Sequence, residues 1–259
     1  MNIVVCVKQV PDTGAERKLR PGDATLDRDS VDGLINELDE YAIEEALQIK
    51  EAHQGEVTVL SMGPDKASES IRKALSMGAD KAVHLADEAL AGSDALATSY
   101  ALAQVLSAIG FDLVVLGAES TDARMGAMAA MLAERLGVAQ LSLASKVEID
   151  GSQVRINRQS ADGYWSVEGT LPAVISVVEK INEPRYPSFK GIMAAKKKPV
   201  QVMSLADAGI DASLVGLANA VTEVVDFAER PPRQAGTIIK DEGDGGNRAA
   251  EFLVAQKFI

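Results

Sequence analysis

The part of the sequence best suited to binding chemistry is the run Leu113-Val-Val-Leu-Gly117 and the residues that follow it, Ala118 to Met128. This order predicts a strand, a loop of small residues and a helix N-terminus, whose backbone N–H groups and positive dipole end suit a phosphate. Gly117 and Gly126 would allow close backbone approach, and Arg124 could add a charge-assisted hydrogen bond. Many strand-to-helix turns look like this without binding anything, so an ordinary turn is the alternative interpretation.

Residues typical of catalysis have no partners at the necessary spacing. The first strand is followed by Lys8-Gln-Val-Pro11 and not by a Gly-x-Gly-x-x-Gly motif, and no Gly-x-x-x-x-Gly-Lys-Ser/Thr motif occurs. His53 and His84 lack neighbours at metal-ligand or triad spacing, so we interpret them as exposed or structural. Cys6 lies in an apolar run, which favours a small core residue. The sequence therefore predicts no catalytic residue and no metal site.

Composition narrows the class of protein. The chain has 259 residues and a formal charge of −12, which argues against a nucleic-acid surface. Its single cysteine excludes an internal disulfide and fits a reducing compartment. No apolar run approaches the roughly 20 residues needed to cross a bilayer, and the chain starts directly on a strand-like run. We expect a cytoplasmic protein without membrane insertion.

The elements that must position the loop follow an alternating pattern. Short β-branched runs at 3–7, 57–61, 81–85 and 112–117 predict strands, and amphipathic stretches at 39–53, 65–77, 93–109 and 122–136 predict helices. This alternation is typical of a parallel sheet that is covered by helices.

The pattern changes in the second half. Lys146 to Glu168 alternates with period two around two Asp-Gly pairs, which predicts antiparallel hairpins, and 173–178 predicts one more buried strand. The fold class that follows is α/β, with a mostly parallel sheet flanked by helices. It is Rossmann-like, of the adenine-nucleotide-binding type, with an antiparallel hairpin added at the edge.

The C-terminal part is rich in prolines and locally basic. Residues 183–198 carry five Lys or Arg against one acid, and prolines at 184, 187, 199, 231 and 232 disfavour core helices and central strands. We predict a nucleotide-binding domain over 1–182. The remainder, 183–259, is predicted to be an extended arm that ends in a short helix at about 247–257 and packs on another chain.

Two stretches carry a family resemblance. They are Leu171-Pro-Ala-Val-Ile-Ser, and the run from Ile181-Asn-Glu-Pro-Arg-Tyr to Ile192-Met-Ala-Ala-Lys-Lys-Lys-Pro199. Val5-Cys-Val-Lys-Gln-Val-Pro11, Ala42-Ile-Glu-Glu-Ala46 and Ala74-Leu-Ser-Met-Gly-Ala-Asp80 support them. The chain resembles the beta subunit of electron-transfer flavoproteins from end to end.

The resemblance implies an electron carrier and not an enzyme. It implies a heterodimer with the alpha subunit, FAD held mainly by that subunit, and a structural AMP bound by the beta chain. It also implies flavin dehydrogenases, such as acyl-CoA dehydrogenases of fatty acid oxidation, as electron donors and a membrane quinone oxidoreductase as acceptor. Residue matching assigns AMP to Cys6, Asn36, Glu37, Leu38, Asp39, Met62, Gly117, Ala118, Glu119, Ser120, Thr121, Asp122, Ala123, Arg124, Met125, Gly126, Ala127 and Met128.

Residues 183–198 resemble the family's recognition loop, which docks the donor dehydrogenases. Phe189 matches the hydrophobic anchor, and a buried aromatic ringed by positive charge is also what interface energetics favour. The predicted steering cations are Arg185, Lys190, Lys196, Lys197 and Lys198. The alternative is a solvated basic loop with Phe189 packed against its own chain.

Two other functions share this architecture. A stand-alone regulator of the universal-stress type would bind ATP or AMP as a homodimer and would lack the basic arm. An adenylating enzyme would need a Ser-Gly-Gly-type loop after the first strand, where Lys8-Gln-Val-Pro11 stands.

Overall fold

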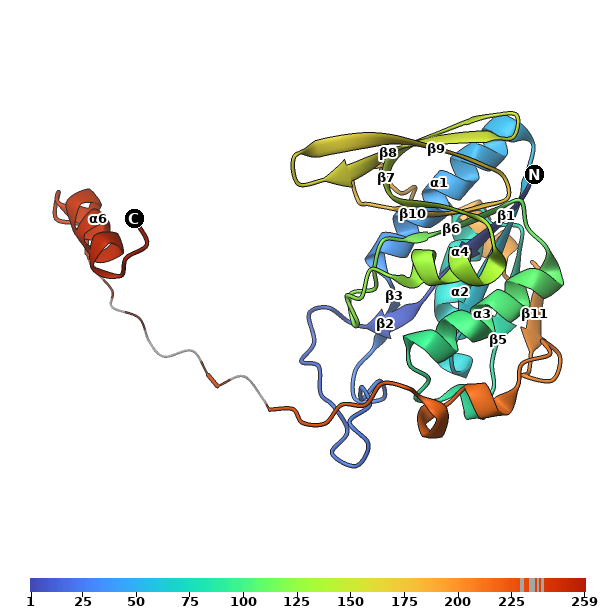
Figure 1. Cartoon of the computed structure of the whole chain (residues 1–259), viewed down its shortest axis with the longest axis horizontal. Helices are drawn as coiled ribbons and strands as arrows, with labels where there is room; N and C mark the ends of the chain where they lie inside the picture. The colour runs from blue at the N-terminus through green and yellow to red at the C-terminus, as the bar shows by residue number, and fades with distance from the viewer. Residues whose placement is uncertain (229–230, 233–235, 237, 239) are drawn as a thin grey trace. The chain divides into compact units, whose positions relative to one another are not determined.

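The computed structural model describes residues 1–228, 231–232, 236, 238 and 240–259, which form two compact units (Figure 1). The first unit is Met1–Glu223 and the second is Val224–Ile259. Each unit is described by itself below.

The first unit is built on a nine-stranded sheet with the order β11-β5-β4-β1-β6-β10-β7-β8-β9. The strands from β11 to β7 pair in parallel. The most apolar segments form the central strands, because central strands of a parallel sheet are buried on both faces. The bounds are β1 Asn2–Cys6, β4 Glu56–Met62, β5 Lys81–Leu85, β6 Leu113–Gly117, β7 Ala139–Asp150, β8 Gln153–Ser160, β9 Gly163–Thr170, β10 Ala173–Val177 and β11 Val200–Met203.

Helices cover both faces of this sheet (Figure 1). One core cluster contains Ile43 and Leu47 of α1 with Ile71 and Leu75 of α2, and the other contains Leu106 of α3 with helix α4. The bounds are α1 Glu37–His53, α2 Ser68–Met77, α3 Ala95–Ile109 and α4 Met128–Leu136, with short 3₁₀ turns at Asp65–Ala67 and Glu88–Leu90. The predicted fold class is confirmed.

The added hairpin is also as predicted. β7 pairs with β8 and β8 pairs with β9, all antiparallel, and the two Asp-Gly pairs stand at the two turns. A second small sheet was missed by the sequence analysis: β2, Gln9–Pro11, pairs antiparallel with β3, Gly33–Ile35. The long loop 12–32 connects these two strands.

One helix begins later than predicted. The sequence pattern placed a helix over 122–136, but α4 starts only at Met128. Arg124 and Gly126 both have positive φ, which interrupts a helical backbone. The side chain of Asp122 is buried by partners that lie far away in the sequence, so the residue belongs to the loop and not to the helix.

Residues 183–223 contain regular structure within the first unit. Helix α5, Phe189–Ala195, lies between Pro187 and Pro199, so these prolines bracket the helix and do not interrupt it. Strand β11 follows Pro199 and pairs with β5 at the sheet edge, where proline is tolerated. Short 3₁₀ turns follow at Ala212–Leu214 and Leu217–Asn219.

The second unit contains helix α6, Gly245–Ala255, which begins two residues before the predicted start. None of its side chains is buried, although Phe252, Leu253 and Val254 are large and apolar. Exposed large apolar side chains of this kind are typical of a segment that packs on a partner.

Candidate functional site

The predicted phosphate loop lies where the order of strands reverses. From β1 the chain proceeds to β4 and β5 on one side, and then crosses to β6 on the other side of β1. The loops after β1 and β6 therefore leave neighbouring strands at the same carboxyl edge of the sheet. Open α/β sheets bind their ligands at such a switch point.

Asn36 joins the loop after β6 to the start of α1. Its buried side-chain amide donates to the backbone oxygen of Glu119 at 3.0 Å, and its Oδ1 accepts from the backbone N–H of Thr121 at 3.0 Å. The amide also donates to Asp39 Oδ1 at 2.9 Å. Asn36, Asp39, Glu119 and Thr121, all predicted as nucleotide contacts, are thus brought together.

Asp39 is the buried carboxylate at the centre of this junction. Its two oxygens accept from the backbone N–H of Lys8 at 2.8 Å and of Gly117 at 3.3 Å, in addition to Asn36. Burial raises the pKa of Asp39 to about 7, although these hydrogen bonds favour the charged form. The carboxyl is therefore poised to titrate near neutral pH.

Gly117 is required by a close contact within the chain. A Cβ at this position would lie 2.6 Å from Asp39 Oδ1 and 2.8 Å from Leu38 Cβ. The last residue of β6 therefore approaches the first turn of α1 as closely as backbone allows. The close backbone approach that the sequence analysis expected at Gly117 is thus made by α1 of the same chain.

Asp122 anchors the loop through two cations. Its carboxylate, with 1% of the side chain exposed, accepts from Lys8 Nζ at 2.8 Å and from Arg28 at 2.7 Å. Burial alone would raise the pKa of Asp122, but the charge and hydrogen bonds of Lys8 and Arg28 hold it well below its ordinary range. Two positively charged side chains therefore meet one carboxylate at this loop.

A third cation, from the loop 12–32, contacts the loop after β6. Arg17 donates to the backbone oxygen of Thr121 at 2.6 Å. Beyond this point residues 123–126 are exposed, just before the first turn of α4. An exposed segment at a helix N-terminus, with cationic side chains beside it, can bind the phosphate of a mononucleotide. Lys8, Arg17 and Arg28 were missed by the sequence analysis.

The other predicted nucleotide contacts lie around this junction or in the core. Cys6, the last residue of β1, is buried, and burial followed by the charge of Asp39 raises the pKa of its thiol to about 12, so the thiol is a poor nucleophile. Glu37 and Leu38 form the first turn of α1 and Met62 ends β4. Ala118 and Ser120 lie in the inner part of the loop, Ala123, Arg124, Met125 and Ala127 in the outer part, and Met128 begins α4.

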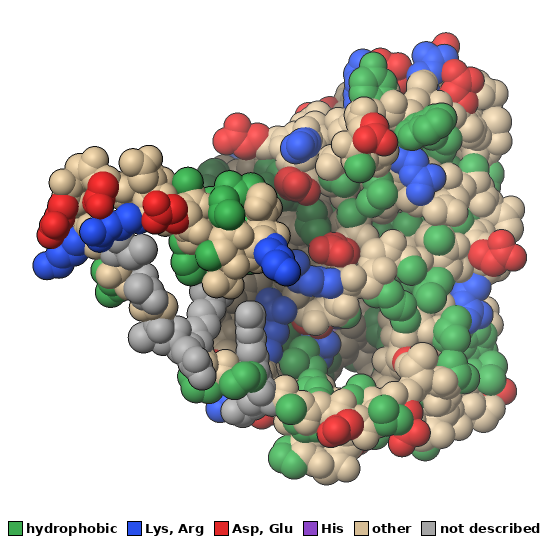
Figure 2. Space-filling view, turned by 60° about the vertical axis from the view of Figure 1, so that its left-hand side comes forward, with side chains coloured by type: hydrophobic (Ala, Val, Ile, Leu, Met, Phe, Trp, Pro, Cys, Tyr) green, Lys and Arg blue, Asp and Glu red, His purple; other side chains and the backbone are tan. Residues whose placement is uncertain are grey.

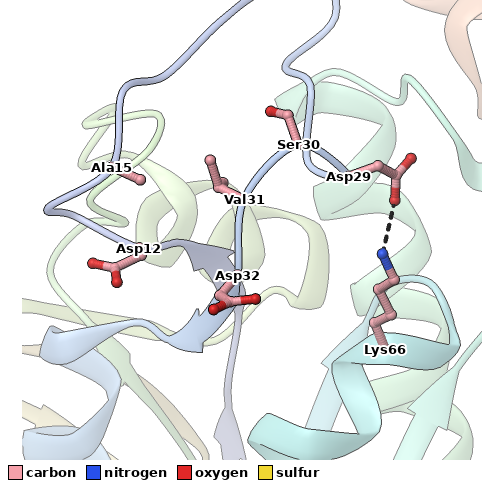
Figure 3. A pocket seen from close by; sticks show the side chains of 7 residues that line it. All are labelled: Asp12, Ala15, Asp29, Ser30, Val31, Asp32 and Lys66. Atoms are coloured by element: carbon pink, nitrogen blue, oxygen red, sulfur yellow. Dashed lines mark hydrogen bonds and ion pairs between the residues drawn. The ribbon is translucent and has the colours of Figure 1, made fainter.

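An open pocket of about 400 Å³ lies beside the loop 12–32 (Figure 3). It is lined by Asp12, Ala15, Asp29, Ser30, Val31, Asp32 and Lys66, and none of these was predicted to bind the nucleotide. Lys66 Nζ donates to Asp29 at 3.1 Å, and Figure 3 shows Asp12 and Asp32 on the other side of the pocket. Three carboxylates would repel a phosphate, so this pocket does not suit a nucleotide.

The predicted docking residues divide into two groups. Phe189 is 80% exposed, and Lys190, Lys196 and Lys197 are exposed with it. Arg185 instead pairs with Glu44 and Glu51, and Lys198 donates to the backbone oxygens of Leu75 and Ala79 at the end of α2. Phe189 is therefore free to contact a partner, while two of the five predicted cations already have partners in the chain.

Other residues singled out in the sequence have structural surroundings. His84 is buried with Nε2 3.0 Å from the backbone oxygen of Gly63, and His53 is exposed in the last turn of α1. Among the described residues no cluster of His, Cys, Asp and Glu could hold a metal ion. In the same part of the chain no helix is both long and apolar enough to cross a membrane. On the face in Figure 2, acidic and basic side chains are interspersed.

Comparisons with known proteins agree with this architecture. The sequence model of the electron transfer flavoprotein domain matches residues 23–208. The chain is 54% identical to the electron transfer flavoprotein subunit beta of Mycobacterium tuberculosis, over 100% of this chain and 99% of the relative. It is 37% identical to the same subunit of Megasphaera elsdenii over the whole of both chains, and 38% identical to Protein FixA of Azorhizobium caulinodans over 91% and 92%.

A match of this extent favours the electron-carrier hypothesis over the regulator and the adenylating enzyme. It includes the strands and loops of the switch point as well as the C-terminal segment. The chain belongs to the electron transfer flavoprotein family, as a beta subunit.

Proposed function

We propose that this chain works in a heterodimer with an electron transfer flavoprotein alpha subunit and transfers electrons without bond-making catalysis of its own. FAD, held mainly by the alpha subunit, supplies the redox chemistry when bound, and a structural AMP is held by this chain. Electrons arrive from flavin dehydrogenases, such as acyl-CoA dehydrogenases of fatty acid oxidation, and leave to a membrane quinone oxidoreductase. The complex is cytoplasmic in this proposal. The relatives' description as beta subunits supports an alpha partner.

The observation that carries the docking part of the proposal is the exposure of Phe189. The exposure of 80% of a phenylalanine side chain to water is unfavourable in free energy. Ile192 and Met193 of the same helix are also half exposed. Lys190 is exposed on the same helix, and Lys196 and Lys197 are exposed directly after it. A central apolar anchor with a charged rim is the arrangement that protein interfaces favour.

The test is the variant Phe189→Ala in the complex with the alpha subunit. Truncation of a buried aromatic anchor commonly costs about 2 kcal/mol, which is roughly a thirtyfold loss of affinity. We expect kcat/KM for reduction of the complex by an acyl-CoA dehydrogenase to fall by about that factor. FAD content, AMP content and Tm should stay unchanged.

The matched control is Tyr164→Ala. Tyr164 is a 66% exposed aromatic residue on β9, which is at the opposite end of the sheet from β11. Its removal should leave the reduction rate intact. If Phe189→Ala lowers FAD content or Tm while the rate per bound flavin stays normal, Phe189 is a structural residue and the docking proposal is wrong.

The loop after β6 at the switch point, with cationic side chains beside it, supports a site for AMP. Residues that would hold the phosphate are the backbone of 123–126 and the Arg17 guanidinium, which already contacts Thr121. Acid extraction of the purified complex should release about one AMP per heterodimer. Arg17→Gln should lower AMP retention by roughly tenfold to a hundredfold, since a charged hydrogen bond contributes roughly 1.5–3 kcal/mol. The control is Lys81→Gln. Lys81 is the first residue of β5 and lies at the amino ends of the strands, away from the loop after β6, so its replacement should leave AMP retention unchanged.

The second unit supports a role as the arm that packs on the alpha subunit. Helix α6 exposes Phe252, Leu253 and Val254, and Phe258 and Ile259 are exposed beyond it. We expect a chain truncated after Glu223 to fold but to lose co-purification with the alpha subunit. Retention of a stoichiometric, flavin-containing complex by the truncated chain would contradict this role.

A further inference from the structure

Arg185 is attached to the body of the first unit more firmly than a steering charge would be. Its Nε donates to Glu44 at 2.7 Å and a terminal nitrogen donates to the second oxygen of the same carboxylate at 3.0 Å. The other terminal nitrogen donates to Glu51 at 2.7 Å, and the Arg185 backbone N–H donates to Glu44 at 3.2 Å. One side chain therefore binds two turns of helix α1.

The charges of this group are balanced within the chain. Only 6% of the Glu44 side chain is exposed, and Gln48 donates a further hydrogen bond to it at 2.9 Å. Burial opposes ionisation of Glu44, but the hydrogen bonds from Arg185 outweigh it and hold the pKa of Glu44 below its ordinary value. Two carboxylates surround one guanidinium, so little positive potential remains to attract a partner.

Further contacts hold the chain on both sides of Arg185. Before it, Asn182 donates to the Tyr41 backbone oxygen of α1 at 3.1 Å. Ser188 accepts from the Gly191 N–H at 3.1 Å and so caps helix α5. A Cβ on Gly191 would overlap the backbone oxygen of Ser76, so α5 lies directly against the end of α2.

The contacts leave one side of α5 free. Gly191 and Ala195, four residues apart, face the body of the protein, whereas Phe189 and Met193, also four residues apart, are exposed. Phe189 is the first residue of α5, so its position depends on the packing of α5 against α2 and on the segment after Arg185 through which the chain enters the helix.

We propose that Arg185 is a positioning residue, which fixes on α1, through Glu44 and Glu51, the segment that leads into the docking helix α5, and does not steer the partner. This inference rests on the proposed docking function. Without the attachment, the residues between Asn182 and Ser188 would sample other conformations, and docking would have to order them. The cost of ordering appears as weaker binding and not as slower electron transfer once bound.

The decisive test uses substitutions with opposite effects on charge. Arg185→Gln removes a positive charge, whereas Glu44→Gln removes a negative one. Steering of an acidic partner predicts that Arg185→Gln slows reduction and that Glu44→Gln accelerates it. Positioning predicts that both variants lower kcat/KM about tenfold, with kcat unchanged, because ordering a loop and its side chains costs roughly 1.4 kcal/mol.

Three further variants sharpen the comparison. Arg185→Lys should recover little, because an ammonium cannot bridge two carboxylates in the way a guanidinium does. The double variant should be no worse than Arg185→Gln alone, since both changes break one interaction. Lys190→Gln, the steering control, should reduce the dependence of kcat/KM on salt, and the Arg185 and Glu44 variants should keep that dependence.

Amide hydrogen exchange separates this inference from the docking proposal. Exchange across 189–195 should be faster in Arg185→Gln than in the unmodified complex, whatever the effect of Phe189→Ala on reduction. Glu51→Gln removes an exposed carboxylate and should increase exchange across 189–195 to a smaller extent. This variant replaces Glu44→Gln in the test if Glu44→Gln does not fold. Faster reduction by Glu44→Gln or Glu51→Gln, or unchanged exchange in Arg185→Gln, would overturn the positioning role.

Discussion

Replacement of Asp39 by asparagine should change how the stability of the protein depends on pH. Burial raises the pKa of Asp39 from an ordinary 3.8 to about 7. Between these values the folded chain keeps a proton that the unfolded chain releases. The free energy of unfolding therefore contains a contribution that is complete below about pH 4 and is lost as the pH rises through 7.

The size of this effect follows from the shift. Each pKa unit corresponds to about 1.4 kcal/mol, so a shift of about three units contributes on the order of 4 kcal/mol. An asparagine at this position cannot titrate. It also presents an N–H group to one of the three donors that surround Asp39, which are Lys8 N, Gly117 N and the Asn36 amide. A constant loss of about 1–3 kcal/mol should therefore accompany the change in pH dependence.

Urea unfolding of the full chain, followed by far-UV circular dichroism from pH 4 to pH 8, measures both effects. The stability of the unmodified chain relative to Asp39→Asn should decrease steadily as the pH rises, by up to about 4 kcal/mol. The ¹³C chemical shift of the Asp39 carboxyl should titrate near neutral pH. A stability difference that is constant or grows with pH would show that the carboxylate is ionised throughout, and the reasoning from burial would be refuted.

Three more substitutions probe the switch point and the contact between the start of α3 and residues 221–222. Gly117→Ala should lower Tm and loosen α1, because the new Cβ would lie 2.8 Å from Leu38; an unchanged Tm would contradict this. Asp122→Ala should cost about 2 kcal/mol in urea unfolding at pH 7, and the cost should shrink progressively as the pH falls below about 4, where the unfolded chain binds a proton that the folded chain still excludes. Asp94→Ala should cost about 1 kcal/mol by uncapping α3 and should speed proteolysis after Thr222, which hydrogen-bonds to it; equal proteolysis rates would refute the second part.

Much of the fold could be predicted because its signals are local. The β-branched runs and the helical periodicity of α1, α2 and α3 depend on neighbouring residues. The Asp-Gly pair at 150–151 and the one at 162–163 specified two hairpin turns, so β7, β8 and β9 were found with their connections. Asn36 was assigned to the site only through the family resemblance, whereas Gly117 was also indicated by the pattern of a strand, a loop and a helix.

The rest depended on contacts between distant residues. Asp122 was assigned to a helix because the apolar spacing continues there, and its ion pair with Arg28 has no local signal. Lys8 could have been found, since it follows the central strand β1 at the edge where ligands bind. Arg185 was taken for a steering cation because composition does not reveal that α1 supplies two carboxylates to it.

The position of β11 has a consequence for biosynthesis. This strand pairs with β5, which leaves the ribosome about 115 residues earlier, or roughly 6 to 20 s at ordinary translation rates. During that interval the outer edge of β5 presents unpaired backbone groups that could capture a strand of another nascent chain. Lys81 and the buried His84 lie on β5, and the charge of Lys81 opposes such pairing at one end. Expression yield of the chain should therefore depend on the speed at which residues 86–203 are translated.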